Sequence, residues 1–164
     1  MALDVGRLFR EHHQALYRYL VAFGGDEATA KDAVQFAFLR MLERPPEDGS
    51  PRAWLYRVAT NAVVEWTRSE GHRRRLAQDR GYPPALGDPP EEASRRAEVN
   101  DARDRLQRVL SRLEERDRTL LLMREEGFTH REMAEAVGTT TGSVGTLLAR
   151  ALKKAGAAMA EEMQ

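Results

Sequence analysis

The chain has 164 residues, with 26 Lys and Arg against 26 Asp and Glu, 41% hydrophobic residues and no cysteine. This length suffices for one domain or two small ones. Because 32% of the residues are charged and no apolar run approaches the roughly 20 residues of a membrane span, a transmembrane protein is excluded. The lack of cysteine excludes disulfides, thiol nucleophiles and thiolate metal sites. The first residues form no signal-peptide core, so we expect a cytoplasmic protein.

The charges are unevenly distributed along the chain. A formal net charge of zero argues against a protein that binds nucleic acid alone through a general positive field. Basic residues nevertheless dominate residues 52–75, and a second basic island includes Arg150, Lys153 and Lys154. The most acidic stretches lie elsewhere, at residues 26–32, 88–104 and 114–135. This separation indicates contact with nucleic acid at two places and with protein elsewhere.

The prolines fall into two clusters, at residues 45–51 and 83–90. Proline disrupts helix interiors, so the segments between the clusters can be helical. The second cluster is poor in apolar residues and predicts a flexible linker over residues 76–100. No strand-like alternation of useful length is present. We therefore predict an all-α fold of two small helical domains, residues 1–75 and 101–164, joined by this linker.

Three helices are predicted in the first domain. Apolar residues at helical spacing over residues 8–23 predict the first helix. Asp26 is placed to cap the second helix, which ends before Pro45. The pair Ser50-Pro51 favours a helix start, because the serine oxygen accepts an orphan amide and proline needs no donor at the first helical position. The third helix is expected to reach about Glu70 and to close at Gly71.

One face of the third predicted helix suits single-stranded DNA. Arg57, Asn61 and Arg68 recur at helical spacing, with Thr60 beside them. Arginines can hold phosphates while an amide or hydroxyl bonds an unstacked base. The alternative is an ordinary solvated helix face. The basic run Arg73-Arg74-Arg75 follows and extends the positive surface.

The second domain contains the spacing of a helix-turn-helix. Thr129 and Glu132 form a predicted capping box that starts a short helix. Gly138 then permits a tight turn, and a further helix follows with Val144 on its buried stripe. In such a motif the second helix enters the major groove of DNA. Other pairs of short helices separated by a glycine can show the same pattern.

Three segments together resemble regions two and four of a bacterial RNA polymerase sigma factor of the extracytoplasmic-function class. They are residues 32–40 (DAVQFAFLR), residues 53–61 (AWLYRVATN) and the helix-turn-helix around residues 142–144. The order, the spacing and the proline-rich join agree with that family over nearly the whole chain. The resemblance implies a two-domain promoter-specificity subunit that is not an enzyme and needs no cofactor. It also implies core polymerase and promoter DNA as partners, with an anti-sigma factor as a further possible partner.

The resemblance assigns roles to particular positions. On the second helix it implies a surface that docks on the β′ clamp helices of polymerase, formed by Asp32, Gln35, Phe36, Leu39 and Arg40. Phe36 replaces the family's glutamate and either adds an apolar contact or turns inward. For region four the resemblance implies contact with the polymerase β flap. The loop of residues 46–50 matches the segment that helps form a pocket for a flipped base, whose extrusion costs a few kcal/mol.

The resemblance also implies DNA contacts in both domains. The residues so implied are Arg57, Thr60, Asn61, Arg68, Arg73, Arg74, Arg75, Thr140, Thr141, Ser143, Thr146, Arg150 and Lys153. Region four departs from the family pattern at Gly145 and Leu147, where basic residues are common. We expect weaker or altered reading of the upstream promoter element, or a shift of this helix toward protein contact. The alternative is that Leu147 joins Leu148 and Leu152 in a broader core stripe.

Two other functions remain open from the sequence. The first is a helix-turn-helix regulator that acts without polymerase, and the second is a sigma-like interaction protein that reads DNA weakly. An enzyme is disfavoured because no paired acid and base, phosphate loop or metal-ligand spacing is evident. The adjacent His12 and His13 point apart on a helix and do not make a metal pair. In the free state we expect the two domains to pack on each other or on an inhibitor, hiding the Arg57 to Arg68 face or the Thr146 to Arg150 helix.

Overall fold

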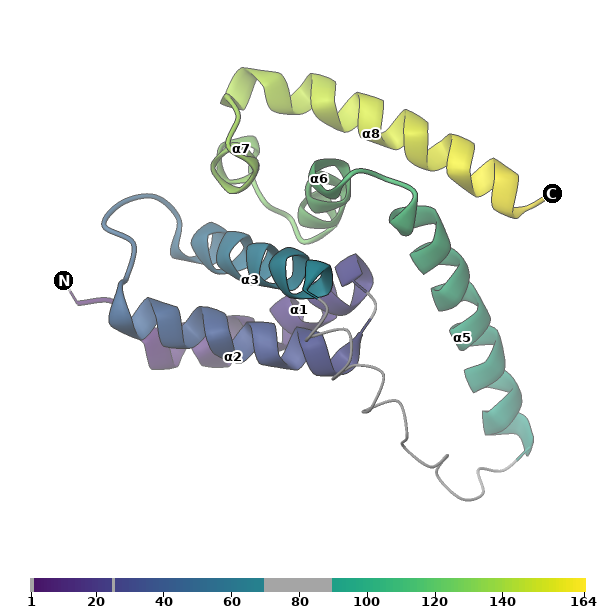
Figure 1. The fold of residues 1–164 in the computed structure, drawn as a ribbon, viewed down its shortest axis with the longest axis horizontal. Helices are drawn as coiled ribbons and strands as arrows, with labels where there is room; N and C mark the ends of the chain where they lie inside the picture. Colours follow the sequence, from purple (N-terminus) through teal and green to yellow (C-terminus); the bar gives the residue numbers. More distant parts are fainter. Residues whose placement is uncertain (1, 25, 70–89) are drawn as a thin grey trace.

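The computed structural model describes residues 2–24, 26–69 and 90–164, and every regular element in these ranges is a helix (Figure 1). The predicted all-α fold is therefore confirmed. The N-terminal bundle consists of α1 (Val5–Gly24), α2 (Glu27–Glu43) and α3 (Pro51–Arg68). The C-terminal bundle consists of α5 (Pro90–Ser111), α6 (Glu115–Glu125), α7 (His130–Val137) and α8 (Thr141–Glu162).

The predicted helix starts of the N-terminal bundle are confirmed by their caps. The Thr29 amide donates to Asp26 Oδ1 at 2.9 Å, and the Ala53 amide donates to Ser50 Oγ at 3.2 Å. These bonds satisfy amides that have no partner within the first helical turn. Helix α3 ends at Arg68, slightly earlier than expected. The predicted closing residue Gly71 lies outside the described residues.

Replacing Asp26 by alanine should lower the free energy of unfolding by about 1 kcal/mol, because one amide of the first turn of α2 loses its acceptor. Urea denaturation followed by circular dichroism measures this change. Asp32→Ala is the control, since Asp32 is an exposed carboxylate inside the same helix. Equal stabilities of the two variants would contradict a capping role.

Helix α5 begins earlier than the sequence analysis expected. The predicted linker extended over residues 76–100, but residues 90–100 are helical in the structure. Proline is favourable at the first helical position, so the last proline of the cluster suits a helix start. The prediction for residues 76–89 falls outside the described residues.

The helix-turn-helix geometry follows the predicted signals. The Thr129 amide donates to Glu132 Oε2 at 2.8 Å, and the Glu132 amide donates to Thr129 Oγ1 at 3.2 Å, which completes the capping box. Gly138 ends α7 with φ of 71°, a left-handed conformation that favours glycine. Thr140 precedes α8, and its hydroxyl bonds the Ser143 hydroxyl at 2.7 Å rather than a backbone amide.

The two bundles pack on each other, as expected for the free state. Helices α6 and α7 lie between α8 and the N-terminal bundle (Figure 1), where α7 contacts α3 and α6 contacts α1. Buried side chains of both bundles form one continuous core. At its centre the Tyr56 and Phe128 rings meet edge to face with centroids 4.7 Å apart. Among the described residues no helix is long and apolar enough to cross a membrane.

Candidate nucleic-acid interface

The predicted DNA-reading face of α3 lies at the border between the bundles. Arg57 and Asn61 are exposed and line a cavity that Glu115 and Thr119 of α6 close from the other side. Arg68 is also exposed, and its Nη2 lies 2.7 Å from Glu115 Oε1. The C-terminal bundle therefore lies next to this face, and its Glu115 forms an ion pair with Arg68.

Thr60 does not share this exposure. Its side chain is buried with 6% of its surface exposed. The Thr60 hydroxyl donates to the Tyr56 carbonyl at 2.6 Å and lies 3.2 Å from Tyr19 Oη. Burial raises the pKa of Tyr19 to about 12, with the hydrogen bond from Thr60 acting in the opposite direction. With the bundles packed, the polar group of Thr60 is therefore satisfied inside the N-terminal bundle, and the residue borders the same cavity as Arg57 and Asn61. Its implied contact with DNA stays a prediction.

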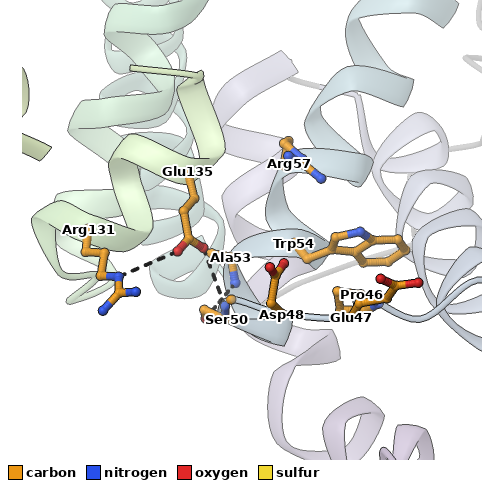
Figure 2. A pocket seen from close by; sticks show the side chains of 10 residues that line it. Pro46, Glu47, Asp48, Ser50, Ala53, Trp54, Arg57, Arg131 and Glu135 are labelled. Atoms are coloured by element: carbon orange, nitrogen blue, oxygen red, sulfur yellow. Dashed lines mark hydrogen bonds and ion pairs between the residues drawn. The ribbon is translucent and has the colours of Figure 1, made fainter. Parts of the chain in front are cut away.

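The loop of residues 46–50 lines a cavity of about 450 Å³ together with Trp54 and Arg57 of α3 (Figure 2). Gly49 has φ of 80°, so the sharp turn of the loop favours glycine. The far wall of the cavity comes from the C-terminal bundle, through Arg131 and Glu135 of α7. The segment implied to accept a flipped base is thus partly covered by the helix-turn-helix.

Two carboxylates of α7 bind the N-terminus of α3. The Ser50 hydroxyl donates to Glu132 Oε1 at 3.0 Å. The Ser50 amide donates to Glu135 Oε2 at 3.4 Å, as Figure 2 shows. Burial alone would raise the pKa of Glu132, but hydrogen bonds from Thr129 and Ser50 outweigh it and lower the pKa. Glu132 was predicted as a cap for α7, whereas its contact with Ser50 was not predicted.

Phe128 is a second feature that the sequence analysis missed. It is 6% exposed, and the Arg52 guanidinium lies 3.8 Å from its ring centroid. Arg52 also donates to the Glu126 carbonyl at 2.8 Å. Phe128 directly precedes the cap Thr129, the position from which an apolar side chain packs on the fourth helical residue, here Met133. That pattern was available from the sequence, but the contact with Arg52 was not.

The predicted recognition helix α8 keeps its outer face exposed. Thr141, Thr146, Arg150 and Lys153 are exposed, and Ser143 is half-buried. The bundle packing therefore does not hide the Thr146 to Arg150 helix. Leu147 is half-buried against the core and Gly145 is exposed. Leu147 therefore packs against the core, which agrees with the alternative that it belongs to the core stripe.

The predicted polymerase-docking face on α2 is also exposed. Asp32, Gln35, Leu39 and Arg40 are accessible, with 60% of the Leu39 surface exposed. Phe36 is half-buried, and its ring meets Trp66 of α3 edge to face at 5.4 Å. Of the two arrangements considered for Phe36, the structure has the inward one, with Arg40 5.2 Å from the ring centroid.

The basic run Arg73-Arg74-Arg75 lies outside the described residues. Within the described part of the chain no group of three or more metal-ligating side chains occurs.

Comparison with known proteins gives the same regions in the same order. Residues 8–73 match the family model of sigma-70 region 2, and residues 103–154 match that of sigma-70 region 4, so that together the matches span more than half of the chain. SigL of Mycobacterium tuberculosis, an extracytoplasmic-function (ECF) RNA polymerase sigma factor, is 38% identical over 103 residues, which is 60% of this chain and 55% of SigL. The chain thus spans about half the length of that relative. YlaC of Bacillus subtilis, an RNA polymerase sigma factor, is 27% identical over 88% of this chain and 85% of its own.

Solved structures share the fold. The sigma factor RpoE from Bartonella quintana, solved with the anti-sigma factor NepR, aligns with a TM-score of 0.65 at 17% identity, over 95% of this chain and 96% of RpoE. CnrH, solved with the cytosolic domain of CnrY, aligns with a TM-score of 0.63 at 23% identity, over 93% and 85% of the two chains. On the two family matches and these relatives, the chain belongs to the sigma-70 family, in the extracytoplasmic-function class of sigma factors.

Proposed function

We propose that this protein binds core RNA polymerase and directs it to a specific set of promoters. Both bundles contact the promoter DNA in this proposal. The observation that carries the proposal is the presence of regions 2 and 4 in one chain, with an exposed α2 face and an exposed outer face of α8. A helix-turn-helix regulator that acts without polymerase is not favoured, because such a protein has no use for region 2.

In this proposal α2 docks on the β′ clamp helices through Asp32, Gln35, Leu39 and Arg40, while Phe36 supports the helix from within. Helix α3 reads the melted downstream element through Arg57 and Asn61. The Arg68 guanidinium binds a backbone phosphate of the same strand. The amide of Asn61 offers both a donor and an acceptor to an unstacked base.

The C-terminal bundle is proposed to bind the upstream element as duplex DNA and to contact the β flap of polymerase. Helix α8 enters the major groove with Thr146, Arg150 and Lys153 on its outer face. Thr140, Thr141 and Ser143 surround the N-terminus of α8, where backbone amides and hydroxyls suit a phosphate. Gly145 supplies no side chain to this surface, so the bundle is proposed to read the upstream element weakly.

The proposed protein acts in the cytoplasm, catalyses no reaction itself and needs no cofactor. NepR and CnrY bind the structural neighbours RpoE and CnrH. An anti-sigma factor is therefore a proposed further partner of this chain.

Run-off transcription tests the proposal. Core polymerase of the source organism is mixed with the chain and a library of genomic fragments, and transcripts are compared with those of core polymerase alone. We expect discrete new start sites that depend on the chain. Their absence, together with a palindromic footprint by the chain alone, would instead favour a regulator acting without polymerase.

The free chain should bind linear duplex DNA poorly. Its net charge is zero, so little counterion release is available to drive association. Fluorescence anisotropy with a duplex promoter found by the run-off assay measures this at physiological salt. We expect specific binding only after core polymerase is added, and tight specific binding by the chain alone would contradict the expectation.

A further inference from the structure

The first half of α8 carries no charged or amide side chain. Residues 138–149, which run from the turn of the helix-turn-helix into α8, contain no Arg, Lys, Asn, Gln, Asp or Glu. In the major groove, arginine and lysine commonly read guanine, asparagine and glutamine read adenine, and acidic residues read cytosine. The N-terminal residues of a recognition helix are the ones that reach the base edges. The usual hydrogen-bonding side chains are therefore missing where α8 would meet the bases.

Methyl groups and bare backbone take their place on the outer face of α8. The exposed residues of these first turns are Thr141, Gly142, Gly145, Thr146 and Ala149. Val144 and Leu148 are buried on the opposite side, and α8 lies at the outer edge of the molecule (Figure 1). Thymine presents a methyl group in the major groove, and the methyl groups of threonine and alanine can contact it. The chemistry of this face therefore matches thymine.

We propose that α8 reads the upstream promoter element through thymine methyl groups, with Thr146 and Ala149 as the residues that contact them. This inference rests on the proposed function of α8 and adds the class of base that it selects. Arg150 and Lys153 follow on the same helix, about 14 and 18 Å beyond Thr141 by helical rise, and there they hold phosphates. The upstream element is therefore expected to contain thymines at the positions that Thr146 and Ala149 reach.

Two glycines on the same face permit the close approach that a methyl contact needs. Both Gly142 and Gly145 lie within α8, and neither has a positive φ that would require glycine. A Cβ at Gly142 would meet no neighbouring group of the described chain within 4 Å, and a Cβ at Gly145 would meet only His130 Cε1 at 4.0 Å. Glycine inside a helix is less stable than alanine. Because packing does not require them, we assign the two glycines to the surface where α8 approaches the base pairs.

Methyl contacts of this kind give a modest selectivity. Burial of one methyl-sized group changes an affinity by about fourfold, so two contacts amount to roughly 15-fold. Such contacts also differ from phosphate contacts in their response to salt. A methyl group releases no counterion, so the preference for thymine should stay constant as the salt concentration changes, whereas overall affinity for DNA falls.

Uracil substitution tests the methyl contact, because uracil lacks only the methyl group of thymine. A promoter found by run-off transcription is synthesised with uracil at every thymine of the upstream segment that the holoenzyme protects in a footprint. Anisotropy of the labelled promoter measures its affinity for the holoenzyme. We expect a loss of about fourfold for each contacted thymine, at low and at high salt. Uracil placed outside the protected segment should leave the affinity unchanged.

Two substitutions of Thr146 separate its methyl group from its hydroxyl. Thr146→Ser keeps the hydroxyl and removes the methyl group, whereas Thr146→Val keeps the methyl group and removes the hydroxyl. Thr146 is exposed, so both variants should fold. We expect Thr146→Ser to bind the thymine promoter about fourfold more weakly and to lose part of its sensitivity to uracil. Thr146→Val should bind and discriminate like the unchanged chain.

Gly145→Ala tests the close approach, and Gly156→Ala is its matched control. Both glycines are exposed on α8, and a Cβ at Gly156 would meet no neighbouring group of the described chain within 4 Å. Gly156 lies about 16 Å further along the helix, beyond the turns that reach the bases. Both variants should show a higher midpoint of urea denaturation, because alanine favours a helix. Only Gly145→Ala should lose affinity for the thymine promoter.

Four results would overturn the inference. Equal affinity for the thymine and uracil promoters would show that methyl groups are not read. The same equality, with weaker binding to a promoter whose guanines lack the N7 acceptor, would identify guanine as the base that is read. Binding lost by Thr146→Val but kept by Thr146→Ser would assign the contact to the hydroxyl. Unchanged binding by Gly145→Ala would show that α8 does not approach the base pairs closely.

Failure of the proposed function gives a different result. In that case the unchanged chain yields no promoter-specific transcript with core polymerase, and the inference is lost together with the function. A chain that directs transcription but ignores uracil in the upstream element would keep the proposed function and lose only the thymine contact.

Discussion

Replacing Asn61 by alanine should impair promoter opening while core polymerase binding stays unchanged. Asn61 is exposed on α3 beside Arg57, on the face opposite to the helix core. Loss of one base-reading side chain costs about 1–3 kcal/mol, roughly 5- to 150-fold in an equilibrium. Permanganate footprinting of the melted region measures the loss, and anisotropy of the labelled chain measures core binding.

Asn100→Ala is the matched control for this variant. Asn100 is an exposed amide on a helix, like Asn61, but it lies on α5, remote from the proposed base-reading face. The same chemical change there should leave opening intact. Normal opening by Asn61→Ala would identify the α3 face as ordinary solvated surface. Loss of core binding would instead show that the substitution disturbs the N-terminal bundle as a whole.

Local signals made much of the fold predictable. Asp26, Ser50 and Thr129 each precede a helix, and each side chain accepts the expected backbone amide. Gly138 adopts the left-handed conformation that ends α7. These features depend on residues three or four positions apart, so their geometry is set by the nearby sequence.

Contacts between the bundles were predicted only in outline. The packing of two domains was expected, and the opposite charges of residues 52–75 and 114–135 were visible in the sequence. The particular partners were not, because Arg52 and Glu126 are 74 positions apart and no local pattern relates them. The start of α5 at Pro90 differs from the sequence prediction for another reason. A proline cluster is typical of a linker, but its last proline also suits the first position of a helix.

Among the site residues, too, what depends on nearby sequence was predictable and what depends on the surrounding fold was not. Exposure of Arg57 and Asn61 agrees with the spacing argument, because residues four apart share a helix face. Thr60 is adjacent to Asn61 and therefore points about 100° away around the helix, toward Tyr19. A resemblance to a family assigns a role to a position in the sequence. Whether the side chain at that position reaches the surface depends on which way it points around the helix.

Replacing Phe128 by alanine should have the largest effect on stability. The ring is buried between Arg52 and Tyr56 at the border of the bundles. Truncation of a buried phenylalanine costs about 3–5 kcal/mol, and here the loss also weakens the contact that holds the bundles together. Urea denaturation measures the stability. Small-angle X-ray scattering should show a larger radius of gyration for the variant, and anisotropy with a labelled single-stranded oligonucleotide should show tighter binding.

Two further variants separate the contact between bundles from the folding of α7. Phe128→Leu keeps an apolar side chain before Thr129, so the C-terminal bundle should stay folded, while the ring contacts with Arg52 and Tyr56 are lost. Phe9→Ala is the matched control, because Phe9 is 41% exposed on α1 and contacts His13 and Phe38 instead. We expect Phe128→Leu to bind the oligonucleotide more tightly and Phe9→Ala to leave that binding unchanged. If both Phe128 variants lost stability but kept the original radius of gyration and oligonucleotide binding, Phe128 would act inside the C-terminal bundle alone.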